Sequence, residues 1–433
     1  MYLNIFNIKK NIRYTIKLVI KADNSKISLS QNFVILIIFF VTIFLLNNEF
    51  IIKYFVWQLP DLFMDMKQGV AWLKCHSLGF DIYNNIEPCY HQRMNYGKIW
   101  LLFPYNETFE KFYSVYFPYL LIFLSIFLIQ KIIRPTNTFE YFLFFLCIFN
   151  PSTILLFERA NLDMLVFVLL ILIIKNKINF INWTLYFFLS FLKIYPVVIL
   201  INFFLEDKSR SLKNLFIYCF VFCLISLCYL FFNFEEYAFI MESSREGKPG
   251  YHFLYSLNSL AKIITYIFGI NYILLLILTY SLFIFLSIKI YQFLIKEKVF
   301  LKENFFTNEH IKLFLVGGYI SCFLFFTVSN FFYKEIFLIC LIPYYLNNIK
   351  MTNNKIFKLI IKLILLRYIF LFIYSYFNVN DGLDIINNQR IFSNAFLTVI
   401  SIKGLIDFIF MSIVSSFLIF ETKNIFNYYL TKY

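Results

Sequence analysis

The sequence predicts an all-α, polytopic membrane protein of about eleven spans, because three observations agree. Hydrophobic residues make up 61% of the 433 positions, and Phe alone supplies 61 of them. A soluble domain could not bury this much apolar surface, so lipid is expected to be the solvent. The net charge of +14 gathers largely in loops between apolar runs, as cytoplasmic loops require. We therefore expect a lipid bilayer, and no nucleic acid, as the partner of this basic chain.

The two ends of the chain are expected in the cytoplasm. Residues 1–32 are polar and rich in Lys and Arg, which retains a segment on the inner side. A single integral membrane domain is expected over 33–420, and residues 421–433 form a cytoplasmic tail. The loops between the apolar runs are too short to form further domains.

The first predicted span, 33–47, leads into the longest polar stretch of the chain, residues 48–111. The basic N-terminus places this loop on the extracytoplasmic side. Cys75 and Cys89 lie within it and could form a disulfide if the loop faces an oxidising compartment. The other six cysteines lie in apolar segments, and no cysteine spacing is typical of a metal site. Neither a metal nor another cofactor is expected.

Nine further apolar runs are expected to cross the membrane as helices. Their alternation leaves the basic loops 289–312 and 348–362 in the cytoplasm. Two of the runs are shorter than the roughly 20 residues of a full crossing, which is typical of an irregular, functional core. The nine runs lie near 112–133, 138–157, 163–174, 212–233, 270–290, 311–330, 335–347, 356–377 and 395–420.

The segment 180–205 is predicted to be a re-entrant hairpin of two half-helices. Basic residues flank both of its ends, so a single crossing would place one basic cluster outside. The break is expected at Lys193-Ile194-Tyr195-Pro196, because Pro196 lacks a backbone donor and disfavours helix at the preceding residue. Broken backbone at membrane depth is tolerated where protein covers it or where it lines a cavity.

Asp61 and Asp65 are the first candidates for chemistry. They are four residues apart just beyond the first span, so on a helix they would share a face. Solvated loop carboxylates are the plain alternative. Their position beside the membrane favours a functional pair, in which one carboxylate accepts a proton from a hydroxyl group.

Polar residues in three other segments are expected on the same outer side. The turn Glu158–Asp163 packs four polar or charged groups between apolar helices, where charges are costly and mark functional candidates. Lys193 at the hairpin tip either reaches toward lipid headgroups or provides a counter-charge for phosphate. A carboxylate, cations and aromatic rings together suit a sugar phosphate carried on a lipid. The candidate binding residues are Arg159, Asn161, Asp163, Lys193, Tyr195, His252 and Lys334.

The motifs resemble those of integral-membrane glycosyltransferases of the GT-C superfamily. The most similar members are polyprenyl-phosphate-mannose-dependent alpha-mannosyltransferases and their bacterial relatives. The resemblance covers roughly residues 55–345. It rests on D-L-F-M-D-M at 61–66, G-F-D-I-Y at 79–83, E-R-A-N-L-D-M-L at 158–165, F-L-K-I-Y-P-V-V at 191–198 and F-F-Y-K-E-I-F-L at 331–338.

The resemblance implies an inverting transferase in a bacterial plasma membrane, with its active site on the extracytoplasmic side. A polyprenyl-phosphate sugar, with mannose the expected hexose, would be the donor, and a lipid- or glycan-linked molecule the acceptor. Asp65 or Asp61 would be the general base, with Asp65 preferred. The family commonly has Gly-Asn or Gln-Asn at the position of Ala160-Asn161, and Tyr-Arg at that of Tyr333-Lys334, so the resemblance leaves the exact donor contacts open.

Three other functions remain open on the sequence. A lipid-linked oligosaccharide polymerase or ligase would use similar substrates, but such proteins usually carry their large polar loop in the second half. A transporter or flippase would explain broken helices and membrane-depth charges, although no two-fold repeat is present. A non-enzymatic assembly protein would explain the apolar composition but not the clustered motifs.

Overall fold

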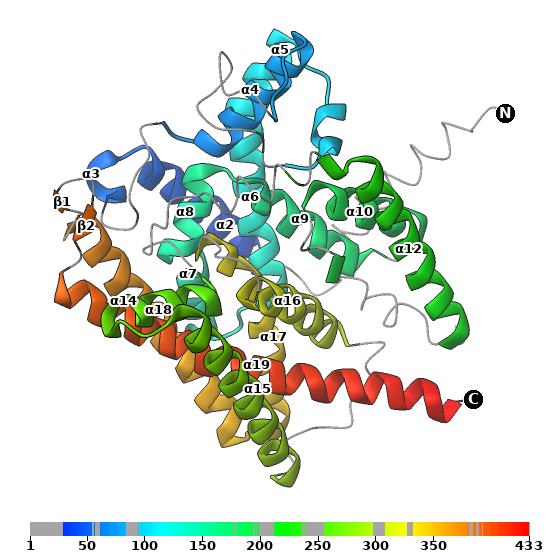
Figure 1. Ribbon diagram of the computed structural model, residues 1–433, viewed down its shortest axis with the longest axis vertical. Coiled ribbons are helices and arrows are strands. Elements are labelled where there is room, and N and C mark those ends of the chain that lie inside the picture. Colours follow the sequence, from blue (N-terminus) through cyan, green and yellow to red (C-terminus); the bar gives the residue numbers. More distant parts are fainter. Residues whose placement is uncertain are drawn as a thin grey trace.

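The computed structural model describes residues 29–53, 56, 61–83, 94, 96–176, 179–193, 195, 197–198, 212–235, 238, 255–297, 308–326, 332–380, 384–386, 389–391 and 393–432. The regular secondary structure of this part of the chain is helical apart from one short antiparallel pair, β1 (Asp384–Ile386) and β2 (Gln389–Ile391), in which Asp384 lies opposite Ile391. The predicted all-α class is therefore confirmed (Figure 1).

The first half of the chain supplies a membrane-type bundle and the helices of the long polar loop. The loop helices α4 and α5 lie together at one end of the molecule, at the top of Figure 1. The elements are α2 (Leu29–Leu46), α3 (Glu49–Ile52), α4 (Met64–Ser77), the 3₁₀ helix η1 (Lys98–Leu102), α5 (Glu107–Lys111), the π turn η2 (Phe112–Tyr116), α6 (Phe117–Ile133), α7 (Thr138–Phe149), α8 (Pro151–Arg159), α9 (Leu162–Lys175) and α10 (Asn179–Leu192).

The second half adds further helices, which pack against the first bundle mainly through α16 and the 3₁₀ helix η5, with smaller contacts from α17 and α18. The last helix, α19, has 39 residues and runs to the C-terminal end of the described chain, at the right of Figure 1. The elements are α12 (Leu212–Phe232), α14 (Leu257–Phe268), α15 (Tyr272–Lys296), α16 (Glu309–Phe326), η5 (Phe332–Leu341), α17 (Ile342–Thr352), α18 (Lys355–Asn380) and α19 (Asn394–Lys432).

Five of the described helices are long and apolar enough to cross a membrane. They coincide with the predicted spans at 112–133, 212–233, 270–290, 311–330 and 395–420. Large apolar side chains on α12 and α15 are exposed, which suits contact with lipid acyl chains. The remaining predicted spans fall on shorter or more charged helices, so the number of about eleven stays a prediction.

The predicted span over 138–157 is bent. The segment is divided into α7 and α8, which meet at an angle of 44° and together are long and apolar enough for one broken span. Asn150 caps α8, since its Oδ1 accepts a hydrogen bond from the Thr153 amide at 3.0 Å. Pro151 occupies the first helical position, where its missing N–H leaves no bond unmade. The Asn-Pro pair therefore ends one helix and starts the next.

The predicted hairpin is described in its first half. Helix α10 ends at Leu192, and Lys193 follows it outside the helix, as the expected break requires. Tyr195 lies in a short 3₁₀ turn. Ile194, Pro196 and residues 199–211 lie outside the described residues, so the return half-helix is not tested.

A glycine allows α16 to pack closely on η5. A Cβ atom at Gly317 would lie 2.5 Å from Cys340 Cβ and 2.8 Å from the Phe337 carbonyl oxygen, both on η5. Side chains lack room for such an approach, and a backbone oxygen has no freedom to rotate away. The position of η5 therefore depends on the absence of a side chain at this one position of α16.

Gly317→Ala is expected to lower the free energy of unfolding by roughly 1–3 kcal/mol, because the added methyl group forces α16 and η5 apart. The matched control is Gly69→Ala on α4, where the new Cβ would meet Trp100 at an ordinary 3.5 Å. Thermal unfolding of the detergent-solubilised protein measures both. A Gly317→Ala protein as stable as the Gly69→Ala protein would contradict the close packing.

Candidate functional site

The start of α4 is held against the turn between α8 and α9. The Phe63 amide donates a hydrogen bond to the Glu158 carbonyl oxygen at 2.8 Å. Phe63 adopts the left-handed conformation, with φ of 63°, and its ring packs edge-on against Tyr119 at 5.0 Å. Asp65 follows in the first turn of α4, where a negative charge interacts favourably with the helix dipole. The long loop thereby delivers one carboxylate to the membrane domain.

Asn161 lies at the centre of the site. Its Oδ1 caps α9 by accepting a hydrogen bond from the Asp163 amide at 3.0 Å. Its Nδ2 donates to Asp65 Oδ2 at 2.6 Å and to the Tyr333 hydroxyl at 3.1 Å. The preceding residue, Ala160, ends α8 in the left-handed conformation, which turns the chain sharply between the two helices. One amide thus joins the loop, α9 and η5.

Lys193 and Tyr195 approach the same turn from the end of α10. Lys193 Nζ donates to Asn161 Oδ1 at 3.0 Å and to Asp163 Oδ1 at 2.7 Å. The Tyr195 hydroxyl donates to Asp163 Oδ1 as well. Asp163 is fully buried, and its Oδ2 has no hydrogen-bond partner among the described residues. That oxygen is a buried acceptor that makes no hydrogen bond in this arrangement.

Two more cations complete the site. Arg159 lies 3.9 Å from Asp65, and the side chains of both residues are largely buried. Lys334 on η5 lies over the Tyr195 ring, 5.5 Å from its centroid, and Lys193 lies over the Tyr96 ring at 5.2 Å. The contacts therefore gather three cations and two carboxylates beside aromatic rings.

Burial changes the proton affinity of two groups at this site. It lowers the pKa of Lys334 to about 8, with Lys193 adding to the shift and Asp163 opposing it. Burial also raises the pKa of Tyr96 well above its usual value, and the Asp65 carboxylate adds to the effect. Tyr96 is therefore a hydroxyl donor at neutral pH, whereas Lys334 loses its charge in mildly alkaline solution.

The structure separates the two aspartates that the sequence paired. Asp61 precedes α4, so the expected shared helical face does not form. Its side chain is 64% exposed and faces Lys67 at 3.9 Å, whereas the Asp65 side chain is 16% exposed. Of the two, only Asp65 contacts Asn161 within the described part of the chain. Asp61 matches the plain alternative of a solvated loop carboxylate.

Most of the other predicted site residues lie together. Arg159 and Asn161 contact Asp65 directly, and Asp163 and Lys193 are joined to it through Asn161. Tyr195 follows through Asp163, and Lys334 reaches the group through Tyr195. His252 lies outside the described residues. Within the described ranges, no group of three or more His, Cys, Asp or Glu residues is placed to hold a metal ion.

Two tyrosines of the site, Tyr333 and Tyr96, were not among the site residues predicted from the sequence. Tyr333 belongs to the F-F-Y-K-E motif, so its place beside Lys334 was a usable signal. Tyr96 carried none, because one tyrosine among 32 in so aromatic a chain is uninformative. In the same loop Cys75 is disulfide-bonded. Its predicted partner, Cys89, lies outside the described residues.

Asn161→Ala is expected to lower the free energy of unfolding by roughly 2–4 kcal/mol, as it removes an N-cap and hydrogen bonds to charged groups. Asn106→Ala is the matched control, since Asn106 caps α5 on the Phe109 amide at 2.9 Å from an exposed position. Its loss should cost about 1 kcal/mol. Equal losses in chemical unfolding of the two proteins would show that Asn161 acts only as a cap.

Comparison with known proteins adds no assignment to this geometry. A scan against protein-family models, a search of curated proteins and a search of solved structures each returned no match. The function is therefore inferred from the chemistry of the site.

Proposed function

We propose that this protein is a GT-C-like glycosyltransferase with about eleven spans. It would move a hexose, with mannose the expected sugar, from a polyprenyl phosphate to a glycolipid or polysaccharide acceptor. The observation that carries the proposal is the bridging amide of Asn161. Its nitrogen orients the Asp65 carboxylate at 2.6 Å, and its oxygen orients the Lys193 ammonium at 3.0 Å. A base and a phosphate counter-charge are thereby held on opposite sides of one side chain.

In the proposed reaction, Asp65 accepts the proton of an acceptor hydroxyl. The hydroxyl oxygen then forms a bond to the anomeric carbon of the donor sugar, and the bond from that carbon to the phosphate oxygen breaks. The electron pair of the broken bond leaves with the polyprenyl phosphate, and the anomeric configuration inverts. No general acid is required, because a phosphate leaves readily as an anion.

The cations have the positions that such a leaving group needs. Lys193, Arg159 and Lys334 offer several N–H donors within a partly buried site, where fixed charge stabilises a developing anion more than in water. The Tyr96 and Tyr195 rings are almost fully buried and lie under the Lys193 and Lys334 ammonium groups, so they help to hold these cations in place. These features support a lipid-linked sugar phosphate as the donor.

The disulfide at Cys75 supports an extracytoplasmic site. Disulfides persist in oxidising compartments, and α4 carries both Cys75 and Asp65. The proposed reaction therefore takes place on the outer side of a bacterial plasma membrane, as the charge distribution of the loops also suggests. A lipid-linked donor is available there, whereas a nucleotide sugar would be used from the cytoplasm.

Asp65→Asn is expected to abolish transfer, whereas Asp61→Asn should leave it within about threefold of wild type. The amide cannot accept the hydroxyl proton, and loss of a general base typically costs 10²–10⁴-fold. The assay uses isolated membranes and radiolabelled polyprenyl-phosphate mannose, with label in a new glycoconjugate as the readout.

The matched aspartates also distinguish the alternatives. Transfer retained by a folded Asp65→Asn protein would overturn the proposed mechanism. Label that grows into long chains in wild type would indicate a polymerase or ligase. Intact donor that only changes leaflet would indicate a flippase.

The donor KM should rise several-fold between about pH 7 and pH 9, because Lys334 is protonated below its pKa of about 8 and neutral above it. Lys334→Arg keeps its proton throughout this range, so its donor KM should stay flat. Initial transfer rates at several donor concentrations measure both proteins. An identical pH dependence of KM in the two proteins would remove Lys334 from donor binding.

A further inference from the structure

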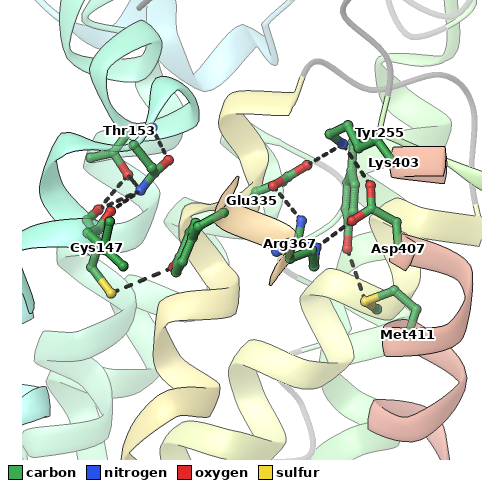
Figure 2. Close-up of polar contacts among 11 residues, drawn as sticks. Cys147, Thr153, Tyr255, Glu335, Arg367, Lys403, Asp407 and Met411 are labelled. Atoms are coloured by element: carbon green, nitrogen blue, oxygen red, sulfur yellow. Dashed lines mark hydrogen bonds and ion pairs between the residues drawn. The ribbon is translucent and has the colours of Figure 1, made fainter. Parts of the chain in front are cut away.

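A second cluster of charges lies buried among the helices of the second half. Glu335 on η5, Arg367 on α18, and Lys403 and Asp407 on α19 are all within a few per cent of complete burial. Arg367 donates to Asp407 through Nε and to Glu335 through Nη2. Lys403 donates to Glu335 at 3.1 Å and to Asp407 at 2.7 Å. Figure 2 shows these four residues, named here the charge quartet, as a closed ring.

The charge quartet is electrically balanced. Two carboxylates face two cations, and all four carboxylate oxygens accept a hydrogen bond. Removing one member of such a buried set leaves an uncompensated charge and is strongly destabilising, even where the set adds little net stability. The ring therefore fixes the relative positions of η5, α18 and α19 with little tolerance for movement.

Glu335 connects this ring to the candidate functional site. Successive side chains of a 3₁₀ helix point about 120° apart, because the helix has three residues per turn. Tyr333 contacts Asn161, Lys334 lies over Tyr195, and Glu335 enters the charge quartet. Three consecutive residues of one stiff segment thus reach the cap of α9, the end of α10 and the buried ring.

A second contact ties the same helix to the other side of the site. Tyr368 follows Arg367 on α18, and its hydroxyl lies 3.6 Å from Cys147 Sγ on α7. Thr153 Oγ1 donates to the Cys147 carbonyl oxygen at 2.8 Å across the α7–α8 break, and Figure 2 shows Cys147 and Thr153 next to each other. Helix α8 then leads directly to Arg159 and Asn161. Adjacent residues of α18 thus contact both η5 and the base of the α8 turn.

We infer that the charge quartet is a positioning element that sets the place of Lys334 and Tyr333 relative to the Asn161 turn. Glu335 and Arg367 touch no reacting atom; they act through η5. The inference rests on the proposed function for the meaning of Lys334 as a phosphate ligand. Its geometric content, that the ring determines where Lys334 lies, stands without any assumption about the reaction.

The test measures Lys334 itself in folded, detergent-solubilised protein. The rate at which acetic anhydride labels Lys334 is followed against pH by peptide mass spectrometry. Asp163, Lys193 and Tyr195 are among the described groups that face this lysine, and none of them is changed. The variants Arg367→Lys and Glu335→Asp keep every charge but change the geometry of the ring. In Arg367→Lys, one ammonium cannot replace the two-pronged guanidinium. In Glu335→Asp, the shorter side chain draws the carboxylate away from its partners.

The matched control is Glu140→Asp. Glu140 is also a buried carboxylate and pairs with Lys350 at 2.7 Å, but it lies on α7 and bonds Thr136 rather than η5. In wild type and in the control, labelling should have its midpoint near the pKa of about 8. In both quartet variants the midpoint should rise by at least one pH unit as Lys334 moves away from its packed position, which lowers the labelling rate at pH 8 about fivefold or more.

An unchanged Lys334 profile in folded quartet variants would overturn the inference and leave the ring a purely structural clamp. A shift of equal size in Glu140→Asp would also overturn it, since any buried carboxylate would then suffice. If Arg367→Lys does not fold, Glu335→Asp carries the same comparison. In the transfer assay the quartet variants should raise the donor KM about tenfold and change kcat little. Absence of transfer in wild type would reject the proposed function but would not alter the labelling result.

Discussion

The Asn161 side chain is the contact on which the arrangement of the site depends. An amide has both donors and an acceptor, so one residue can bond a carboxylate, a hydroxyl, an ammonium and a helix N-terminus together. Its partners, Asp65, Lys193 and Tyr333, come from three segments that are far apart in the chain. A carboxylate in this place would release the Asp65 contact, and an apolar residue would leave α9 uncapped. The long loop, the end of α10 and η5 are therefore positioned relative to one another by this side chain.

Much of the fold and part of the site were readable from the sequence. Apolar runs gave the helices, because such segments satisfy their own backbone hydrogen bonds in lipid. Charged residues within apolar surroundings gave Asp163 and Lys193, since such groups are costly without partners. The choice between Asp61 and Asp65 was not readable. A spacing of four residues brings two side chains together only if both lie on a helix, and α4 begins at Met64.

The residues that were not predicted from the sequence are those whose positions depend on tertiary contacts. Lys403 and Asp407 are four apart on α19, which was a local signal for an ion pair. No local sequence pattern connected these two residues to Arg367 or Glu335, so the sequence indicated no function for the last two predicted spans. The break at Asn150 had a signal in its Asn-Pro pair, but the apolar run on both sides masked it. A buried ring of ion pairs depends on how distant helices pack against one another, and a local sequence pattern does not give this packing.

The length of α19 has a consequence for how the protein meets its bilayer. Its 39 residues extend for about 58 Å at the rise of an α-helix, nearly twice the hydrocarbon thickness of about 30 Å. Known tilts are too small to place such a rod wholly inside. The helix must therefore emerge from the acyl region, where the partly exposed Tyr428 suits the headgroup layer. The point at which α19 leaves the acyl region therefore determines how far the bundle, including Lys403, lies from the membrane surface.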